Sequence, residues 1–154
     1  DASRLGEFDN GTVEFLELPT ELHQAIVLYL YLQLHQFLAS SSEHPGVCLV
    51  APLKVRLWEG RYREPDLVFL LSKNSRLRTS QVWNGADLVI EVVSESNPNR
   101  DWIDKRSDYA RGGVPEYWIV DPRDRTITVL QLDETTCVYE SVQTFREGEQ
   151  TVSK

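Results

Sequence analysis

Two acidic residues stand inside otherwise apolar stretches of this 154-residue chain. Asp66 follows Pro65 in EPDLVFLL, and Glu91 lies in the middle of ADLVIEVV. Charged side chains are rarely buried without a partner or a metal. If the two stretches form neighbouring strands, opposed Cβ atoms lie about 5 Å apart and both carboxylates can face one cation. Mg²⁺ suits such a pair, because it binds one or two carboxylates and keeps water and phosphate as its other ligands.

The same two acids also have a purely structural explanation. Asp66 would then be a strand-edge aspartate, and Glu91 a core glutamate in an ion pair. Alternation places Asp87 and Glu91 on one face of the predicted strand. Because Asp87 stands near the start of that strand, we interpret it as a capping residue rather than a ligand.

Lys105 is the third candidate for chemistry. It lies four residues from Asp101 and four from Tyr109 in a predicted helix, so the three side chains share one face. A solvated Asp–Lys pair at this spacing contributes only a few tenths of a kcal/mol. The alternative is an ammonium group folded over the two carboxylates, where it could orient the attacking water or stabilise charge developing on a phosphate.

The histidines and the common catalytic motifs add little. His23 and His35 are about 120° apart around one helix, so they cannot form one metal site alone. His23, in the first helical turn beside Glu21, faces either a site at the edge of the sheet or solvent. The sequence contains no GxSxG, phosphate-binding glycine loop or HExxH motif, so hydrolase triads, nucleotide-binding loops and zincins have no support.

Hydrophobic periodicity predicts an α/β fold: a mixed sheet with helices packed on it. The predicted strands are 12–18, 47–58, 62–71, 86–93, 116–120, 126–132 and 136–145, and the predicted helices are 21–39 and 101–111. Residues 72–85 are expected to form a loop, with room for a short helix, and Gly112-Gly113 to end the second helix. The buried face of the first helix is expected to comprise Leu22, Ala25, Ile26, Tyr29, Leu30 and Phe37.

Length and composition predict a single domain over residues 1–154. No apolar run approaches the roughly 20 residues that span a bilayer, and residues 1–10 show no export signal. Cys48 and Cys137 lie far apart, which predicts free thiols and favours the cytoplasm. Because methionine is absent, also at position 1, we expect the chain to be trimmed. The net charge of −8 argues against broad, non-specific adhesion to nucleic acid, although clustered carboxylates can recruit a metal that meets phosphate.

Three stretches resemble the core of the Uma2 (DUF820) family of restriction-endonuclease-like proteins: REPDLVFLL, ADLVIEVVSES and RDWIDKRSDYARGGVPEYWIVDP. The resemblance runs from about Leu18 to Leu132 and is densest over Ala86–Pro122; PTELHQ, which contains His23, also resembles the family pattern. That family belongs to the PD-(D/E)XK nuclease superfamily. The resemblance therefore implies a restriction-endonuclease-like αβββαβ core with additional β-strands.

The resemblance also implies a set of site residues. Pro65-Asp66 matches the PD motif and Glu91 the (D/E) position, whereas Val93 stands where the superfamily has its lysine. Lys105 matches the helical lysine that is offered as a substitute in Uma2 proteins. Asp66, Glu91 and Lys105 are then the expected catalytic residues, and Mg²⁺ or Mn²⁺ the expected ion on Asp66 and Glu91. The expected outer contacts are Glu21, His23 and Tyr109.

The expected function is endonucleolytic hydrolysis of phosphodiester bonds in DNA by a cytoplasmic homo-oligomer, a dimer being favoured, with no membrane partner. One alternative is a nuclease-fold binding or assembly module without catalysis, favoured by Val93 and the net charge of −8. Another is a structural homo-oligomer in which copies pair through an edge strand of the hairpin Glu116–Leu132, with Tyr117 and Trp118 as contact residues.

Overall fold

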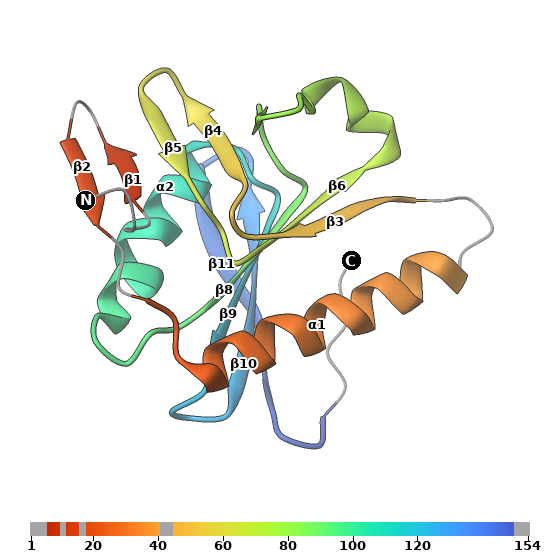
Figure 1. Ribbon diagram of the computed structural model, residues 1–154, viewed down its shortest axis with the longest axis vertical. Coiled ribbons are helices and arrows are strands. Elements are labelled where there is room, and N and C mark those ends of the chain that lie inside the picture. The colour runs from red at the N-terminus through yellow and green to blue at the C-terminus, as the bar shows by residue number, and fades with distance from the viewer. Residues whose placement is uncertain (1–5, 10–11, 16–17, 41–44, 150–154) are drawn as a thin grey trace.

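The computed structural model describes residues 6–9, 12–15, 18–40 and 45–149 (Figure 1). The helices and strands follow the predicted order with two additions: β1, and β7, which lies in the stretch 72–85 that was predicted to be a loop. In chain order they are β1 (Gly6–Asp9), β2 (Thr12–Phe15), α1 (Glu21–Ser40), β3 (Gly46–Val50), β4 (Lys54–Trp58), β5 (Arg61–Arg63), β6 (Leu67–Leu71), the 3₁₀ helix η1 (Ser72–Leu77), β7 (Val82–Trp83), β8 (Leu88–Val92), the π-helix η2 (Arg100–Lys105), α2 (Arg106–Arg111), β9 (Glu116–Asp121), β10 (Thr126–Asp133) and β11 (Val138–Arg146).

The main sheet has six strands in the order β11-β10-β9-β8-β6-β3, and only β8 and β9 run parallel. All five residues of β8 are buried, as expected for a nearly continuous apolar strand covered on both faces. Along the chain, α1, β3, β6, β8, the η2–α2 segment and β9 reproduce the expected αβββαβ order. The predicted α/β class is therefore confirmed, and β10 and β11 are the additional strands.

The second sheet, in the order β2-β1-β5-β4-β7, corrects two predicted strands. The predicted strand 47–58 divides into β3 in the main sheet and β4 in the second, with a cis peptide bond between Ala51 and Pro52. The predicted strand 62–71 likewise divides into β5 and β6. Both passages contain a proline, Pro52 and Pro65, which is unfavourable inside a central strand, and the prediction did not use this signal.

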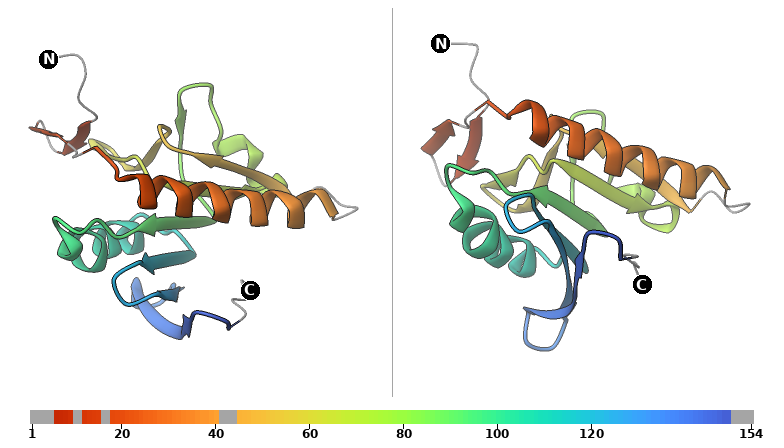
Figure 2. Two further views of the ribbon diagram at one scale, coloured as in Figure 1. Left: turned by 60° about the horizontal axis from the view of Figure 1, so that its bottom comes forward. Right: turned by 90° about the horizontal axis from the view of Figure 1, so that it is seen from below.

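Alternate residues of β8 face two different cores. Val89 packs in a cluster with Tyr109 of α2, whereas Ile90 packs in a cluster with Val27 and Leu30 of α1. The main sheet therefore lies between α1 on one side and the η2–α2 segment on the other (Figure 2). Glu91, which follows Ile90, points to the η2–α2 side.

The predicted buried face of α1 is largely wrong. Leu22, Tyr29 and Phe37 are 58%, 62% and 69% exposed, whereas Leu30, together with Val27, is buried. Apolar residues occupy nearly the whole circumference of this helix, so their spacing alone could not select the side that meets the sheet.

The predicted pairing edge is also wrong. The hairpin Glu116–Leu132 contains β9 and β10, which lie inside the main sheet, and its Tyr117 and Trp118 are buried. The edge on that side is β11, because it adds to β10 over eight residue pairs. Local sequence could not reveal this, since strand order depends on pairing between distant segments.

The two cysteines are free, as predicted: Cys48 is buried and Cys137 is exposed. Burial raises the pKa of the Cys48 thiol to about 12, so this side chain behaves as a small apolar core group. Among the described residues, no helix is both long enough and apolar enough to cross a membrane.

The start of β3 provides a first testable prediction. A Cβ atom at Gly46 would overlap the carbonyl oxygen of Leu70 and lie 2.6 Å from a ring carbon of Phe69. Because backbone atoms of a paired strand cannot give way easily, Gly46→Ala should lower the free energy of unfolding by about 1–3 kcal/mol. Urea unfolding measures this loss; an unchanged midpoint would contradict the tight approach of β3 to β6.

Candidate active site

Strand register brings the two predicted acids together. In the antiparallel pair β6–β8, Leu67 lies opposite Ile90, so Asp66 and Glu91 are the next pair in register. The amide of Asp66 donates to Glu91 Oε2 at 3.3 Å, and the amide of Val92 donates to Asp66 Oδ2 at 2.8 Å. The two carboxyl groups therefore lie side by side on one face of the main sheet, where β6 begins and β8 ends.

The η2–α2 segment brings Lys105 to the same place. Lys105 Nζ lies 2.9 Å from Glu91 Oε2 and 2.9 Å from Asp101 Oδ1, so one ammonium group bridges two buried acids. One turn later, the hydroxyl of Tyr109 donates to Glu91 Oε1 at 2.5 Å. Both oxygens of Glu91 are thus held by this segment. The bridging residues lie in a π-helix, a wide turn that is frequent at functional sites.

Asp101 is the member of this centre that sequence reasoning did not select. It was considered only as a solvated partner of Lys105, but it is 3% exposed, and the hydroxyl of Tyr117 donates to its backbone oxygen at 3.0 Å. The available signal was the spacing Asp101, Lys105, Tyr109, which places three polar groups on one helical face.

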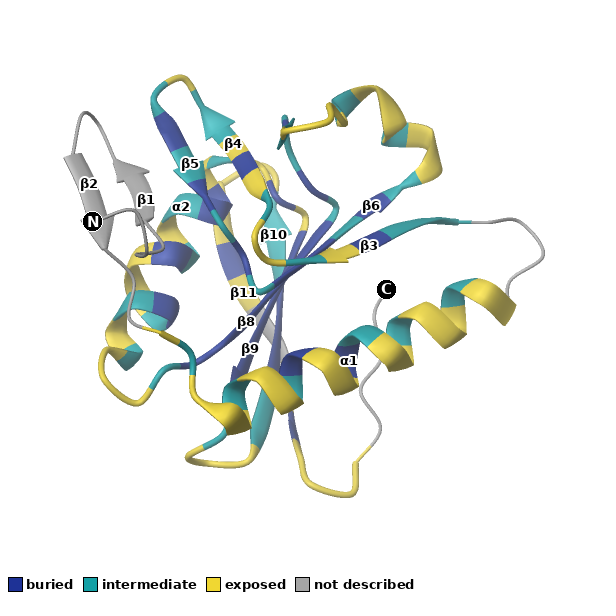
Figure 3. Ribbon diagram, viewed as in Figure 1, coloured by how far each residue is buried: buried dark blue, intermediate teal, exposed yellow. Residues whose placement is uncertain are grey.

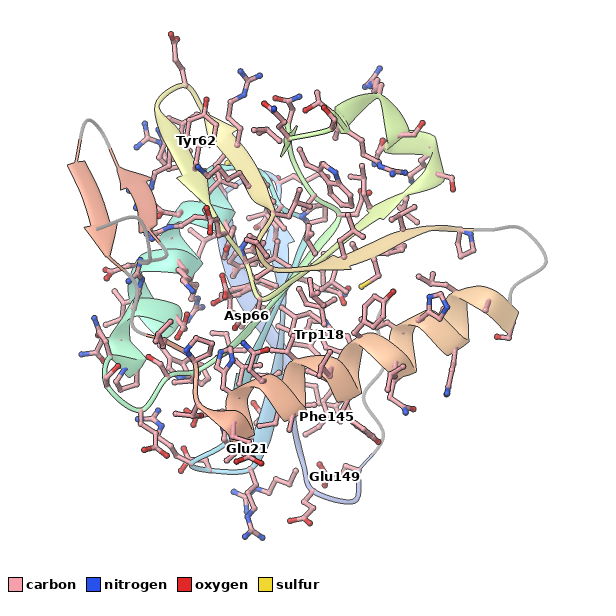
Figure 4. The ribbon with its side chains drawn as sticks, viewed as in Figure 1. Glu21, Tyr62, Asp66, Trp118, Phe145 and Glu149 are labelled. Atoms are coloured by element: carbon pink, nitrogen blue, oxygen red, sulfur yellow. The ribbon has the colours of Figure 1, made fainter. Side chains whose placement is uncertain are left out.

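The start of α1 contributes His23, whose Nε2 lies 3.1 Å from Asp66 Oδ2. The position is half-buried, so the solvent-facing alternative for this histidine is wrong. Glu21 is exposed in the first turn, and Figure 4 shows it on the opposite side of α1 from Asp66. Asp87 accepts hydrogen bonds from the amide of Leu71 and the side chain of Asn74, both at 2.7 Å, in the capping role expected of it.

The electrostatics of the centre are dominated by burial. Burial raises the pKa of Glu91 to about 8; Lys105 and Tyr109 oppose the rise, while Asp66 and Asp101 add to it. Burial also raises the pKa of Asp101 against the opposing effect of Lys105. These shifts express the cost of holding three carboxyl groups in a region of low dielectric with one ammonium group between them.

The pKa of His23 is raised above its ordinary value. Burial alone lowers it, but the hydrogen bond and negative charge of Asp66, together with the charge of Glu91, outweigh that effect. The environment therefore favours an imidazolium ion paired with Asp66. Burial makes the ionised form of Glu91 costly at neutral pH, and a cation bound beside it would offset that cost.

A cavity of about 830 Å³ lies in front of this centre. Asp66, Asp101, Lys105 and His23 line it directly, whereas Glu91 is fully buried behind them. The lining also includes other polar residues, among them Glu64, Glu95 and Arg100. Its apolar residues include Leu18, Pro19, Leu22, Val27, Leu28, Val50 and Pro52. The cavity can therefore receive a ligand that places a polar group on the acidic centre and an apolar part against α1.

The donor set fits a hard divalent cation. Among the described residues no group of three or more histidine, cysteine, aspartate or glutamate side chains is arranged around one point. Mg²⁺ needs no such group, because one or two carboxylates and several water molecules complete its shell. Asp66 and Glu91 supply these two carboxylates, and a cation beside Glu91 would offset the burial that raises the pKa of that group. Glu91 Oε2 already binds Lys105, so coordination through that oxygen requires the ammonium group to shift.

Comparison with known proteins agrees with this fold. The Uma2 family, described as "Putative restriction endonuclease", matches residues 4–154. Among solved structures, the chain is similar to the crystal structure of "a putative nuclease belonging to DUF820 from Anabaena variabilis ATCC 29413". The TM-score is 0.78 at 15% identity, over 97% of this chain and 80% of that one, which establishes a shared fold. The comparison with curated proteins finds no match.

Proposed function

The chain belongs to the Uma2 family, and from that membership and the acidic centre we propose that it is a metal-dependent nuclease that hydrolyses phosphodiester bonds in DNA. The observation that carries the proposal is the pairing of Asp66 with Glu91 in front of a cavity, with Lys105 Nζ 2.9 Å from Glu91 Oε2. Two carboxylates and an adjacent cation are the groups that metal-assisted hydrolysis of a phosphodiester needs.

In the proposed site, Asp66 and Glu91 hold Mg²⁺ or Mn²⁺ through their carboxylate oxygens. A bound ion would polarise the scissile phosphate and lower the pKa of a water molecule. Tyr109 fixes the orientation of Glu91 through Oε1, which leaves Oε2 on the side of Asp66. Lys105 supplies the ammonium group that stabilises negative charge developing on the phosphate, and Asp101 holds that group within reach.

His23 has a supporting role in this proposal. Its pairing with Asp66 orients that carboxylate, and its raised pKa keeps a second positive charge at the cavity where a phosphate would enter. Glu21, exposed on the other side of α1, has no part in the proposed centre.

A second function has its own support. Lys105 and His23 already pair with the two acids, and Val93 stands at the position of the superfamily lysine. These features, with a net charge of −8, suit a nuclease-fold module that binds or assembles without cleaving. Such a module needs no divalent cation, so metal dependence separates the two functions.

The deciding experiment compares the wild-type protein with Asp66→Asn in two measurements. The first is nicking and cleavage of supercoiled, linear and single-stranded DNA with Mg²⁺, Mn²⁺ or EDTA. The second is the shift of the melting temperature on adding either metal, since an ion that binds only the folded state stabilises it. Asparagine keeps the shape of Asp66 and an acceptor oxygen for Val92, so the fold should persist.

We expect wild-type cleavage only with metal, and a loss of at least about 100-fold in Asp66→Asn, the upper end of what loss of an outer-shell metal contact costs. The metal-induced rise in melting temperature should disappear in the same variant. Asp124→Asn is the matched control, because it removes the same charge from an exposed turn. Wild-type protein that neither cleaves nor gains stability with metal would favour the inert module instead.

A further inference from the structure

Helix α1 has a second apolar face that no described residue covers. Leu22, Ala25, Leu28, Tyr29 and Leu32 follow three- and four-residue spacing, which places them on one stripe of the helix. All are exposed, Leu22 by 58%, Leu28 by 54%, Tyr29 by 62% and Leu32 by 51%. We call this stripe the outer face. Figure 3 shows α1 largely exposed along its length, with its buried residues turned toward the sheet.

The outer face carries one charge, because exposed Glu21 precedes Ala25 by four residues and lies at the N-terminal end of the stripe. Across its 20 residues α1 has one acidic residue, Glu21, and no lysine or arginine. A solvated helix face ordinarily carries charged side chains, and 26% of this chain is charged. The polar side chains along the stripe are the neutral Gln33 and Gln36. An apolar stripe with a single charge at one end is typical of a surface that another protein covers.

We propose that the outer face packs against the outer face of a second copy of this chain, with the two α1 helices antiparallel about a twofold axis. Charge is compatible with this occupant. Two copies, each with a net charge of −8, repel one another, and the outer face, with Glu21 as its one charged residue, brings few like charges together. Nucleic acid is a poor alternative, because the face offers no cation to a phosphate.

The size of the face also suits a dimer. A 20-residue helix is about 30 Å long, and the four large side chains of the outer face together expose on the order of 400 Å², at about 100 Å² for each half-exposed large side chain. The stripe continues through exposed Gln33, Gln36 and Ala39. With these, α1 approaches the surface of about 800 Å² per partner that a stable interface buries. Isologous pairing satisfies both copies with the same residues.

The interface borders the cavity without entering the acidic centre. Leu22 and Leu28 belong to the outer face and also line the cavity. Dimerisation therefore covers the part of each cavity that Leu22 and Leu28 line. The proposal does not depend on whether the site cleaves DNA.

The test is the oligomeric state, measured by light scattering and sedimentation over a range of micromolar concentrations. Wild-type protein should be a dimer, and the double variant Tyr29→Glu/Leu32→Glu a monomer with an unchanged circular dichroism spectrum. Val138→Glu is the matched control, because Val138 is 54% exposed on the edge strand β11. It should remain dimeric.

A monomeric wild type, a double variant that stays dimeric, or a Val138→Glu protein that dissociates would each overturn the proposal. If the double variant fails to fold, a cross-link decides. Leu32→Cys in a Cys137→Ser background places one accessible thiol near the middle of α1, where antiparallel copies approach one another. Oxidation should give a covalent dimer, and its absence would also overturn the proposal.

Discussion

Replacing Lys105 with methionine is expected to lower the free energy of unfolding by about 3–5 kcal/mol in metal-free buffer. The side chain of Lys105 is 11% exposed. Its ammonium group pairs with Glu91 and Asp101, whose side chains are 0% and 4% exposed. Methionine fills the same space without charge, so the variant removes the ammonium group that pairs with both buried acids. Urea unfolding in EDTA measures the loss. Lys73→Met, at an exposed position, should change stability by no more than about 0.5 kcal/mol.

A double variant distinguishes a structural role of Lys105 from its proposed catalytic role. Adding Glu91→Gln to Lys105→Met removes a buried charge, so the double variant should recover a substantial part of the lost stability. It should not recover metal-dependent cleavage, which is expected to fall about 100-fold or more when the ammonium group is lost. If Lys105→Met were as mild as Lys73→Met, the lysine would not be the counter-ion of this centre. If the stabilised double variant cleaved normally, neither residue would act in the reaction.

The acids of this centre could be predicted because their neighbours are apolar. A carboxyl group inside ADLVIEVV must be buried if that segment is a central strand, and β8 is one. Asp66 could be placed beside Glu91 once β6 was taken as the strand next to β8, because the antiparallel register that pairs Leu67 with Ile90 also sets Asp66 opposite Glu91. Lys105 could be assigned only with the family resemblance, because a lone helical lysine is ordinarily solvated.

Other features of the structure could not be predicted, because the residue types carry no signal for them. The π-helical turn that buries Asp101 inserts extra backbone without changing the pattern of side chains. Helix α1 is apolar on two faces, so its buried side could not be chosen. Each of these depends on contacts between distant segments, which local periodicity does not encode.

Strand β5 of the second sheet holds the site in place by contacting Asp108 of α2. Replacement of Asp108 is expected to have the other large effect. Asp108 belongs to α2, next to Tyr109, and its Oδ2 accepts hydrogen bonds from two arginines of β5. Arg63 donates from Nε at 2.9 Å and from Nη2 at 2.6 Å, and Arg61 donates from Nε at 3.0 Å and from Nη2. The side chain of Arg61 is 9% exposed and that of Arg63 is 3% exposed, so one carboxylate is shared by two buried guanidinium groups.

Asp108→Ala should therefore lower the free energy of unfolding by at least about 3–5 kcal/mol, because two buried cations lose the carboxylate between them. Asp104→Ala removes the same charge from an exposed position of η2 and should cost no more than about 0.5 kcal/mol. The segment that carries Lys105 and Tyr109 is anchored to β5 through this carboxylate, so the folded fraction of Asp108→Ala should also cleave more slowly than Asp104→Ala. Equal unfolding energies for the two variants would show that β5 is held to α2 by packing alone.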